Sequence, residues 1–209
     1  MRNLVLWSGG SDSTLLLYQL SKNNSDDTIN AVSICTSYAP DSIEIKKEKN
    51  CRENIKKYFN EIGIKNVIYT EIEINMPLNR EFETWSSLMF YPIIYLGNIS
   101  PYLKPNDMVY LAYIKEDIEL HFKYPILNLA KLISSIININ FELKFPFEYK
   151  SKIDVLDEII KLNLLDKVSW CSHPLNDGSP CKKCRSCVMH YSALYGLKLK
   201  KGEIDESSL

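Results

Sequence analysis

Two groups of residues in this 209-residue chain have the types and spacing that chemistry requires. The first is the heptapeptide Ser8-Gly9-Gly10-Ser11-Asp12-Ser13-Thr14, and the second is a set of four cysteines close to the C-terminus. The heptapeptide offers hydroxyl and backbone N–H donors, and its two glycines let the main chain approach a ligand closely. A loop of this composition suits an anion, above all a phosphate or a pyrophosphate.

The segments that flank the heptapeptide predict how it is positioned. An apolar run at residues 3–7 precedes it and an apolar helical pattern at 13–22 follows, so we expect strand, loop, helix. The positive end of that helix would further stabilise an anion. The P-loop is excluded because the lysine is missing, and the dinucleotide fingerprint is excluded because the third glycine is missing. A plain Gly-Gly turn with an N-cap is the simpler alternative, but it accounts for only one of the small polar residues.

The four cysteines form a C-x9-C-x2-C-x2-C pattern made of Cys171, Cys181, Cys184 and Cys187. Four thiolates at this spacing can close a tetrahedron around Zn²⁺, and a set filled by protein alone indicates a structural site. An iron–sulfur cluster is the alternative, since C-x2-C-x2-C also occurs in ferredoxins. Prolines and a glycine between the ligands favour a tight loop.

The other cysteines and the histidines give weaker signals. Cys35 lies in an apolar strand pattern and is expected in the core, and Cys51 is expected on a helix face. His190 follows the cysteines on an expected helix, and His173 lies between them. His121 is a site candidate, but a lone histidine is more often an ordinary core or surface residue.

The composition limits the classes of function. A net charge of −1 and 45% apolar residues are ordinary for a globular protein, and they give no strong signal for nucleic acid binding. No apolar run reaches the length of a membrane helix, and the chain starts without a signal-peptide pattern, so we expect a cytoplasmic protein. In that compartment cysteines are more often metal ligands or core thiols than disulfides.

The remaining pattern alternates strands and helices. We expect further strands at 29–36, 67–74, 108–114 and 141–145, and helices at 41–62, 81–99 (with Pro92 as a break or start), 126–137 and 155–165. This predicts an α/β fold with a doubly wound, Rossmann-like parallel sheet, whose ligands bind at the carboxyl ends of the strands. The heptapeptide, Thr36-Ser37-Tyr38 and Lys115-Glu116-Asp117 would all lie at that edge.

The heptapeptide resembles the PP-loop of the ATP pyrophosphatases, which cleave ATP between its α and β phosphates. Together with the cysteine pattern, it makes the chain resemble the 7-cyano-7-deazaguanine synthases of the queuosine pathway. Ser169-Trp170-Cys171 also resembles that family, as does Pro146 followed by Lys152 and Asp154. The resemblance implies a PP-loop (HUP-type) sheet with a C-terminal zinc-binding loop, a homodimer, and conversion of 7-carboxy-7-deazaguanine with ammonia and ATP to the nitrile.

The middle of the chain departs from the family. The family carries Tyr-Gly-Gln-Arg/Lys-His and a glutamate three positions on. Here only Tyr38 and Glu53 correspond to parts of this segment, and Asn50 stands where the histidine is expected. Of the family's Pro-x-Arg-Asn segment only Pro92 remains. The family's Gly-Tyr-Pro-Asp-Cys-Arg segment, expected to help hold the deazaguanine, is replaced by residues 112–122. There Glu116, Asp117 and Glu119 are candidates to accept from a guanine-like edge.

The resemblance implies roles for the loop residues. Ser8, Gly9, Gly10, Ser11, Ser13 and Thr14 would hold the pyrophosphate, and Asp12 would place Mg²⁺ or orient the loop. Lys152 is the candidate for an extra cation on the phosphates, with Lys150 as its rival and a solvated lysine as the simpler reading. We expect Asp12, Ser11 and Lys152 to be catalytic, ATP, Mg²⁺ and Zn²⁺ as cofactors, and an acceptor that carries or receives a deazaguanine-like group.

We expect three parts along the chain: an ATP-pyrophosphatase domain at 1–165, a zinc-binding element packed on it at 166–200, and a polar tail at 201–209. Three alternatives to the synthase activity stay open. The first is a divergent enzyme of a phage or an antiphage defence system with another acceptor, and the second is a nucleotide-binding partner subunit without catalysis. The third is a tRNA-modifying PP-loop enzyme, which the charge and the lack of a basic RNA module disfavour.

Overall fold

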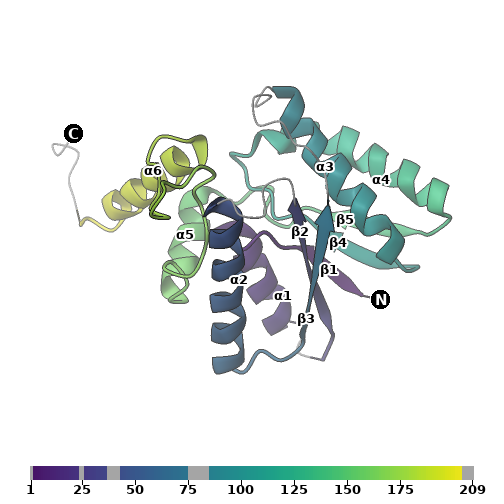
Figure 1. Ribbon diagram of the computed structural model, residues 1–209, viewed down its shortest axis with the longest axis horizontal. Helices are drawn as coiled ribbons and strands as arrows, with labels where there is room; N and C mark the ends of the chain where they lie inside the picture. Colours follow the sequence, from purple (N-terminus) through teal and green to yellow (C-terminus); the bar gives the residue numbers. More distant parts are fainter. Residues whose placement is uncertain (1, 24–25, 37–42, 75–84, 204–209) are drawn as a thin grey trace.

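A computed structural model describes residues 2–23, 26–36, 43–74 and 85–203, and within them five strands form one parallel sheet (Figure 1). The strands are β1 (Asn3–Leu6), β2 (Ile29–Thr36), β3 (Val67–Ile74), β4 (Asp107–Tyr110) and β5 (Phe141–Lys144). They lie in the order β3-β2-β1-β4-β5, and every neighbouring pair is parallel. The predicted α/β class with a parallel sheet is confirmed, and the order is that of a doubly wound sheet.

Helices cover both faces of the sheet and bury two apolar clusters. On one face lie α1 (Ser11–Asn23), α2 (Ile43–Glu61) and α5 (Lys152–Lys161), whose apolar residues pack around Val5 and Ala31. On the other face lie α3 (Trp85–Ile99) and α4 (Lys123–Ile137), packed around Leu4 and Val109 (Figure 1). Because β1 is central and buried on both faces, it reads as a continuous apolar run.

The register places the ends of the strands at one edge. Leu6 of β1 pairs with Val32, and Val5 pairs with Tyr110, the last residue of β4. The Trp7 N–H donates to the Val32 carbonyl at 2.8 Å, so the pairing continues one residue beyond β1. The segments that follow β1 and β4 therefore leave the sheet side by side. Of the predicted exit after β2, Ser37 and Tyr38 lie outside the described residues.

Three predicted boundaries differ from the structure. Helix α3 continues through Pro92, because Leu96 and Ile99 beyond it are fully buried and their packing outweighs the missing hydrogen bond. Strand β4 stops at Tyr110, well before residue 114, and a turn follows. Helix α5 starts at Lys152 rather than 155, because Ser151 and Asp154 form a capping box. Lys152 is therefore the first residue of a helix and not part of a loop.

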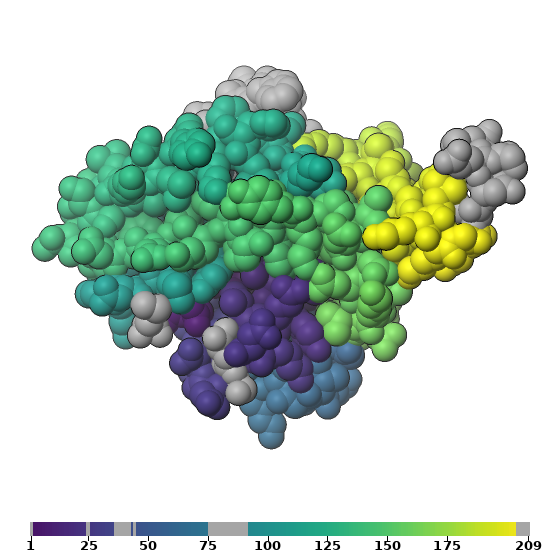
Figure 2. Space-filling view, turned by 180° about the vertical axis from the view of Figure 1, so that it is seen from behind, coloured from purple at the N-terminus to yellow at the C-terminus, as the bar shows by residue number. Residues whose placement is uncertain are grey.

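The C-terminal part packs at one end of the molecule. Helix α6 (Arg185–Lys200) lies against α5, and Figure 2 shows it in yellow beside the green of α5. The two helices approach closely, since a Cβ at Gly196 would lie 2.9 Å from Ile153 Cδ1. Two short 3₁₀ helices, η2 (Ser100–Tyr102) and η3 (Ile118–Phe122), complete the elements. In the described part of the chain, no helix has the length and apolarity to span a membrane.

Candidate functional site

The small-residue loop joins β1 to α1 at the carboxyl edge of the sheet, as predicted. Gly9 has φ +86°, a conformation that favours glycine, and it is buried. The Thr14 N–H donates to the Gly10 carbonyl at 3.0 Å and begins the hydrogen bonding of α1. The N–H groups of residues 11–13 lie ahead of that first bond, at the positive end of the helix. Backbone and dipole are therefore arranged as an anion site requires.

Local hydrogen bonds fix the conformation of the loop. The Ser8 and Ser13 hydroxyl oxygens lie 3.1 Å apart, and the Gly10 N–H donates to Ser8 Oγ at 3.2 Å. Thr14 is fully buried, and its Oγ1 accepts from the Trp7 indole N–H at 3.0 Å. Thr14 thus stabilises the loop from beneath, whereas the hydroxyl of Ser8 lies at the surface.

Lys152 reaches the loop from α5, across 140 residues of sequence. Its ammonium lies 2.6 and 2.9 Å from the two carboxylate oxygens of Asp12 and 2.8 Å from Ser11 Oγ. The Lys152 side chain is only 10% exposed, so this ion pair is mostly withdrawn from water. The three residues predicted to be catalytic therefore form one contact group.

The rival lysine takes no part in this group. Lys150 pairs with Glu158 on α5, and its ammonium lies 4.8 Å from the centre of the Phe147 ring. Glu116 contacts the backbone at the start of α5, where its Oε2 accepts a hydrogen bond from the Lys152 N–H at 3.2 Å. Geometry thus favours Lys152 over Lys150 as the loop cation.

Arg52 is a site residue that the sequence analysis missed. It lies on α2, is 3% exposed, and donates from Nη1 to the Ser8 carbonyl at 3.3 Å. Its Cγ lies 2.9 Å from where a Cβ of Gly9 would be. A signal was available, because Arg52 shares its helix face with the fully buried Ile55 and Phe59. A buried guanidinium needs hydrogen-bond acceptors, and here the Ser8 carbonyl of the loop is one of them.

The guanidinium of Arg52 is also held from the sheet. Its Nη2 lies 3.2 Å from Glu71 Oε1 and 3.1 Å from Cys35 Sγ. Burial, together with the hydrogen bond to Glu71, raises the pKa of the Cys35 thiol to about 11, so it stays neutral. Burial alone would raise the pKa of Glu71, but the Cys35 hydrogen bond and the charges of Arg52 and Lys49 lower it. Cys35 is buried, as predicted.

A cavity of about 240 Å³ opens beside the loop, between the ends of β1, β2 and β4. Its walls are mainly apolar and aromatic, and three loop residues face it: Ser8, Asp12 and Ser13. The remaining lining residues are Leu6, Trp7, Val32, Ile34, Tyr95, Leu111, Ala112, Tyr113 and Asp117. An apolar cavity with a few polar groups at one end is typical of a small-molecule site.

Asp117 is the acid that this cavity receives from the divergent segment. Its Oδ2 accepts from the Ile114 N–H at 2.8 Å. Burial, with the nearby charges of Asp12 and Glu119, raises the pKa of Asp117 to about 7. Of the three acids predicted to replace the family's acceptor residues, only Asp117 lines the cavity, while Glu116 contacts the start of α5.

The four cysteines come together as predicted. The Sγ atoms of Cys171, Cys181, Cys184 and Cys187 all lie within 4.8 Å of one another, and those of Cys181 and Cys187 are 4.0 Å apart. Thiolates in a tetrahedron around Zn²⁺ would lie about 3.8 Å apart. The cluster can therefore hold a metal ion such as zinc.

Backbone amides support the ionised form of this cluster. The Cys184 N–H donates to Cys181 Sγ and the Cys187 N–H to Cys184 Sγ, at 3.3 and 3.4 Å. Hydrogen bonds from the N–H groups of Lys183 and Cys184 lower the pKa of Cys181 to about 6. Burial, together with the neighbouring thiols, raises the pKa of Cys187 to about 12. A cation is therefore what would let all four ionise together.

His190 packs beside the segment that carries the cysteines. It is on α6, 1% exposed, and stacks on Trp170 with ring centres 4.2 Å apart. Burial, helped by the charge of Lys152, lowers the pKa of His190 to about 4, so the ring is neutral at pH 7. The other two histidines, His121 and His173, are exposed.

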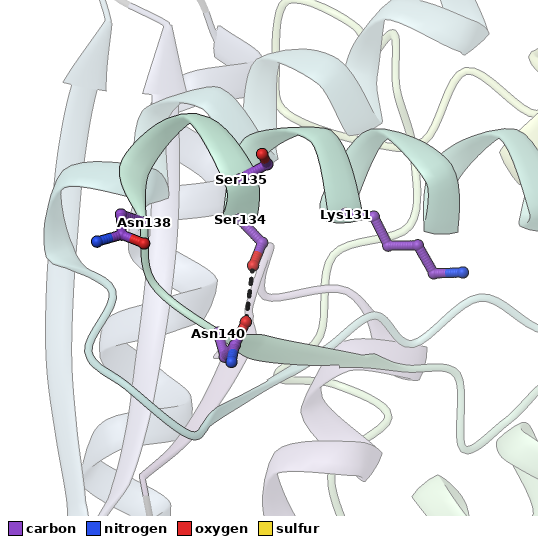
Figure 3. Close-up of a pocket in the computed structure, with 5 residues that line it drawn as sticks. All are labelled: Lys131, Ser134, Ser135, Asn138 and Asn140. Carbon is purple, nitrogen blue, oxygen red and sulfur yellow. Dashed lines mark hydrogen bonds between the residues drawn. The ribbon is translucent and has the colours of Figure 1, made fainter.

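A second hollow, of about 450 Å³, lies at the opposite edge of the sheet. Figure 3 shows its lining at the end of α4 and the start of β5, where Ser134 Oγ lies 3.5 Å from Asn140 Oδ1. Lys131, Ser135 and Asn138 complete the lining. Ligands of parallel α/β sheets bind at the carboxyl edge, so we base no function on this hollow.

No protein-family model matches the chain, and no curated protein matches it.

Proposed function

We propose that this protein is an ATP-dependent ligase of the PP-loop type, which adenylates a carboxylate, releases pyrophosphate and then forms a C–N bond. The observation that carries the proposal is the contact of Lys152 with Ser11 and Asp12, in a loop at the carboxyl edge of a parallel sheet. The resemblance to the 7-cyano-7-deazaguanine synthases supports 7-carboxy-7-deazaguanine as the carboxylate.

The loop would bind the leaving pyrophosphate. The hydroxyls of Ser8 and Ser13, which bond to each other in the free protein, would turn to the phosphate oxygens, and the N-terminus of α1 adds N–H donors. Thr14 would act only from beneath, because its hydroxyl is already bonded to Trp7. Arg52 would keep the Ser8 carbonyl, and with it the loop, in place.

Lys152 and Asp12 would compensate the charge of the pyrophosphate in different ways. Lys152 would neutralise negative charge that develops on the pyrophosphate, in a site from which water is mostly excluded. The Asp12 carboxylate and the Ser11 hydroxyl are hard oxygen donors of the kind that Mg²⁺ takes alongside ATP phosphates. Bound there, Mg²⁺ would supply further neutralisation of the leaving group.

The chemical steps need no side-chain nucleophile. A carboxylate oxygen of the acceptor attacks the α-phosphorus, the bond from that phosphorus to the bridging oxygen breaks, and pyrophosphate leaves with the electron pair. Ammonia or an amine then attacks the carbonyl carbon of the mixed anhydride, AMP leaves, and a proton is released. The protein would act mainly by placing the two reactants in the cavity and by compensating charge.

A different acceptor is the second candidate, and Asp117 favours it. The half-buried Asp117, whose carboxyl has a pKa raised to about 7 by desolvation, stands where the family carries another segment. A divergent enzyme, of a phage or an antiphage defence system, would keep the ATP chemistry and apply it to another small molecule or to a protein.

Mass spectrometry of the reaction products tests the proposal. Protein would be mixed with Mg²⁺-ATP, ammonium and 7-carboxy-7-deazaguanine, and AMP, pyrophosphate, amide and nitrile would be followed, with acceptor omitted as the control. AMP together with amide or nitrile supports the synthase assignment. AMP that appears only when another acid is supplied supports the second candidate. ADP as the sole nucleotide product contradicts both.

A further inference from the structure

The segment that leads into the cysteine cluster is bonded to the small-residue loop. The Ser169 N–H donates to the Gly9 carbonyl at 3.0 Å, and Gly10 pairs with Ser169 in a parallel bridge. A Cβ at Gly10 would lie 3.4 Å from the Ser169 carbonyl oxygen, so the two backbones are close. Cys171 of the cluster follows only two residues later. One predicted metal ligand is therefore almost adjacent to the predicted anion site.

A second connection leaves the cluster from its other side. Arg185, which follows Cys184 and opens α6, donates from Nη2 to the Glu116 carbonyl at 3.3 Å. The carboxylate of the same Glu116 accepts from the Lys152 N–H at 3.2 Å. The start of α6 is thereby tied to the start of α5, where the loop cation is placed.

The packing of α6 against α5 reinforces this second connection. The buried face of α6 carries Cys187, His190, Ala193 and Leu197, and α6 lies on α5. From the far side, Lys47 of α2 donates to the Gly178 carbonyl at 2.9 Å and lies 5.7 Å from the centre of the Trp170 ring. The cysteine element is thus in contact with the helices on both sides of the loop.

The cysteine element has little apolar packing of its own. All residues from 171 to 187 are described, and among them only the two end cysteines, Cys171 and Cys187, are buried. The segment between them is held by turn bonds, such as Leu175 N–H to the Ser179 carbonyl at 2.9 Å, and by the contacts to sulfur. A metal ion on the four thiolates is therefore the strongest constraint that this segment can acquire.

We propose that the cysteine element positions the small-residue loop, with Ser169 as the positioning residue, and that metal binding and pyrophosphate binding favour each other. A metal that fixes Cys171 also fixes the Ser169 N–H against Gly9, and the same metal on Cys184 fixes Arg185 against Glu116. Coupling between two sites is reciprocal. Bound pyrophosphate must therefore raise the affinity for the metal by the same factor by which bound metal raises the affinity for pyrophosphate. The pyrophosphate half rests on the proposed function.

Hydrogen exchange tests the positioning half without any nucleotide. Protein with one bound zinc per chain and protein stripped with a chelator would be compared, after circular dichroism shows that both are folded. We expect amides of residues 8–14 to exchange at least about tenfold faster without metal, because the coupling of two sites is typically 5- to 150-fold. Amides of α4, which belongs to the other apolar cluster, serve as the control and should change little. Equal exchange of residues 8–14 in two folded forms would overturn the proposal.

Equilibrium zinc binding tests the coupling in the loaded protein. The partition of zinc between the protein and a chromophoric chelator would be measured with and without inorganic pyrophosphate. A protein-free titration corrects for zinc held by pyrophosphate itself, and calorimetry measures the binding of pyrophosphate to the protein. We expect bound pyrophosphate to raise the zinc affinity about tenfold. A zinc affinity that bound pyrophosphate leaves unchanged would overturn the coupling. If calorimetry detects no pyrophosphate binding, the proposed function fails instead, and the exchange comparison alone decides the positioning half.

A pair of variants at one position sharpens the test. Ser169→Pro removes the N–H that donates to Gly9, whereas Ser169→Ala keeps it and removes only the hydroxyl. With zinc content and melting temperature checked first, we expect Ser169→Pro to reduce the effect of pyrophosphate on zinc affinity to twofold or less, and Ser169→Ala to preserve it. A full effect in Ser169→Pro would contradict the role of Ser169. If Ser169→Pro does not fold, the two measurements on the unmodified protein stand as the test.

Discussion

The segment after β1 and the segment after β4 meet at one cavity but differ in how their chemistry is built. After β1, the loop is held by its own hydroxyls, by Arg52 from beneath and by Lys152 from α5. After β4, residues 111–122 form a turn and a short 3₁₀ helix, and they present Tyr113 and Asp117 to the cavity. One side is a compact, hydrogen-bonded loop whose geometry suits an anion, and the other is an apolar wall with one acid.

The two carboxylates show the difference most clearly. Asp12 is paired with Lys152 at 2.6 Å, whereas Asp117 accepts only a backbone N–H in the bonds described, and burial raises its pKa to about 7. The first is suited to pair with a cation beside a phosphate. The second is suited to proton exchange or to a ligand donor. In the proposed function the first belongs to the nucleotide side and the second to the acceptor side, and because different segments build them, variants on each side should have separable effects.

The largest effect is expected on the loop side. Lys152→Ala should lower AMP formation by about 10²- to 10³-fold, because it removes the one cation among the described residues that contacts the loop carboxylate. Lys150→Ala is the matched control and should change the rate less than twofold, because Lys150 pairs with Glu158. Rates would be followed by chromatography of AMP at saturating ATP. Equal losses in the two variants would show that the loop side has no dedicated cation.

Gly9→Ala should reduce the free energy of unfolding by roughly 2–3 kcal/mol, because a Cβ there combines positive φ with contact against Arg52. Gly63→Ala is the control for φ alone. Gly63 has φ +79°, but no atom of the described residues lies within 4 Å of its Cβ position, so the loss of stability should be about 1 kcal/mol. Urea denaturation of both variants measures the difference. A Gly9→Ala protein no less stable than Gly63→Ala would deny that Arg52 supports the loop.

Asp117→Asn should act on the acceptor side alone. We expect the KM for the acceptor to rise roughly tenfold, as for loss of a charged hydrogen bond, while the Kd for ATP stays within twofold. Initial rates and calorimetry supply the two values. Glu116→Gln, a change in an exposed acid outside the cavity lining, serves as the control. A parallel rise in the Kd for ATP would show that the two sides are not separable.

The last expected effect is a pH dependence of stability. The pKa of Asp117 is about 7 in the folded protein and about 3.9 in the unfolded chain, so between these values the folded state binds more protons. The stability contributed by protonated Asp117 is therefore present below pH 4 and lost as the pH rises to about 7. Relative to Asp117→Asn, the unmodified protein should lose at most about 4 kcal/mol between pH 4 and pH 8, and less because solvent screens the half-buried carboxyl. Denaturation curves that shift in parallel for both proteins would contradict this.

Much of the fold follows from local patterns. β2 and β3 occupy the predicted residues, and the other strands and helices begin and end close to their predicted bounds. Buried parallel strands and amphipathic helices can be predicted because their periodicity is strong. The errors arise where non-local packing decides. Pro92 stays helical because Leu96 and Ile99 are buried beyond it, and α5 starts early because of the Ser151 capping box.

The candidate site likewise has parts that local sequence predicts and parts that it does not. The small-residue loop and the four cysteines are contiguous or closely spaced, so their residue types alone predict them. The contact of Lys152 with Asp12 joins residues 140 apart, and the support from Arg52 comes from another helix. Such contacts depend on the strand order, which local periodicity does not determine. The cavity wall formed by residues 111–122 is least predictable, because a single half-buried acid among apolar residues forms no motif.

Transfer of an isotopic label tests the central claim most directly. The acceptor, 7-carboxy-7-deazaguanine, would carry ¹⁸O in its carboxylate, and the AMP formed with Mg²⁺-ATP and ammonium would be weighed by mass spectrometry. If the carboxylate attacks the α-phosphorus, each AMP carries one ¹⁸O atom and appears in equal amount with pyrophosphate. AMP without label, or ADP and phosphate in its place, would contradict carboxylate adenylation at this loop.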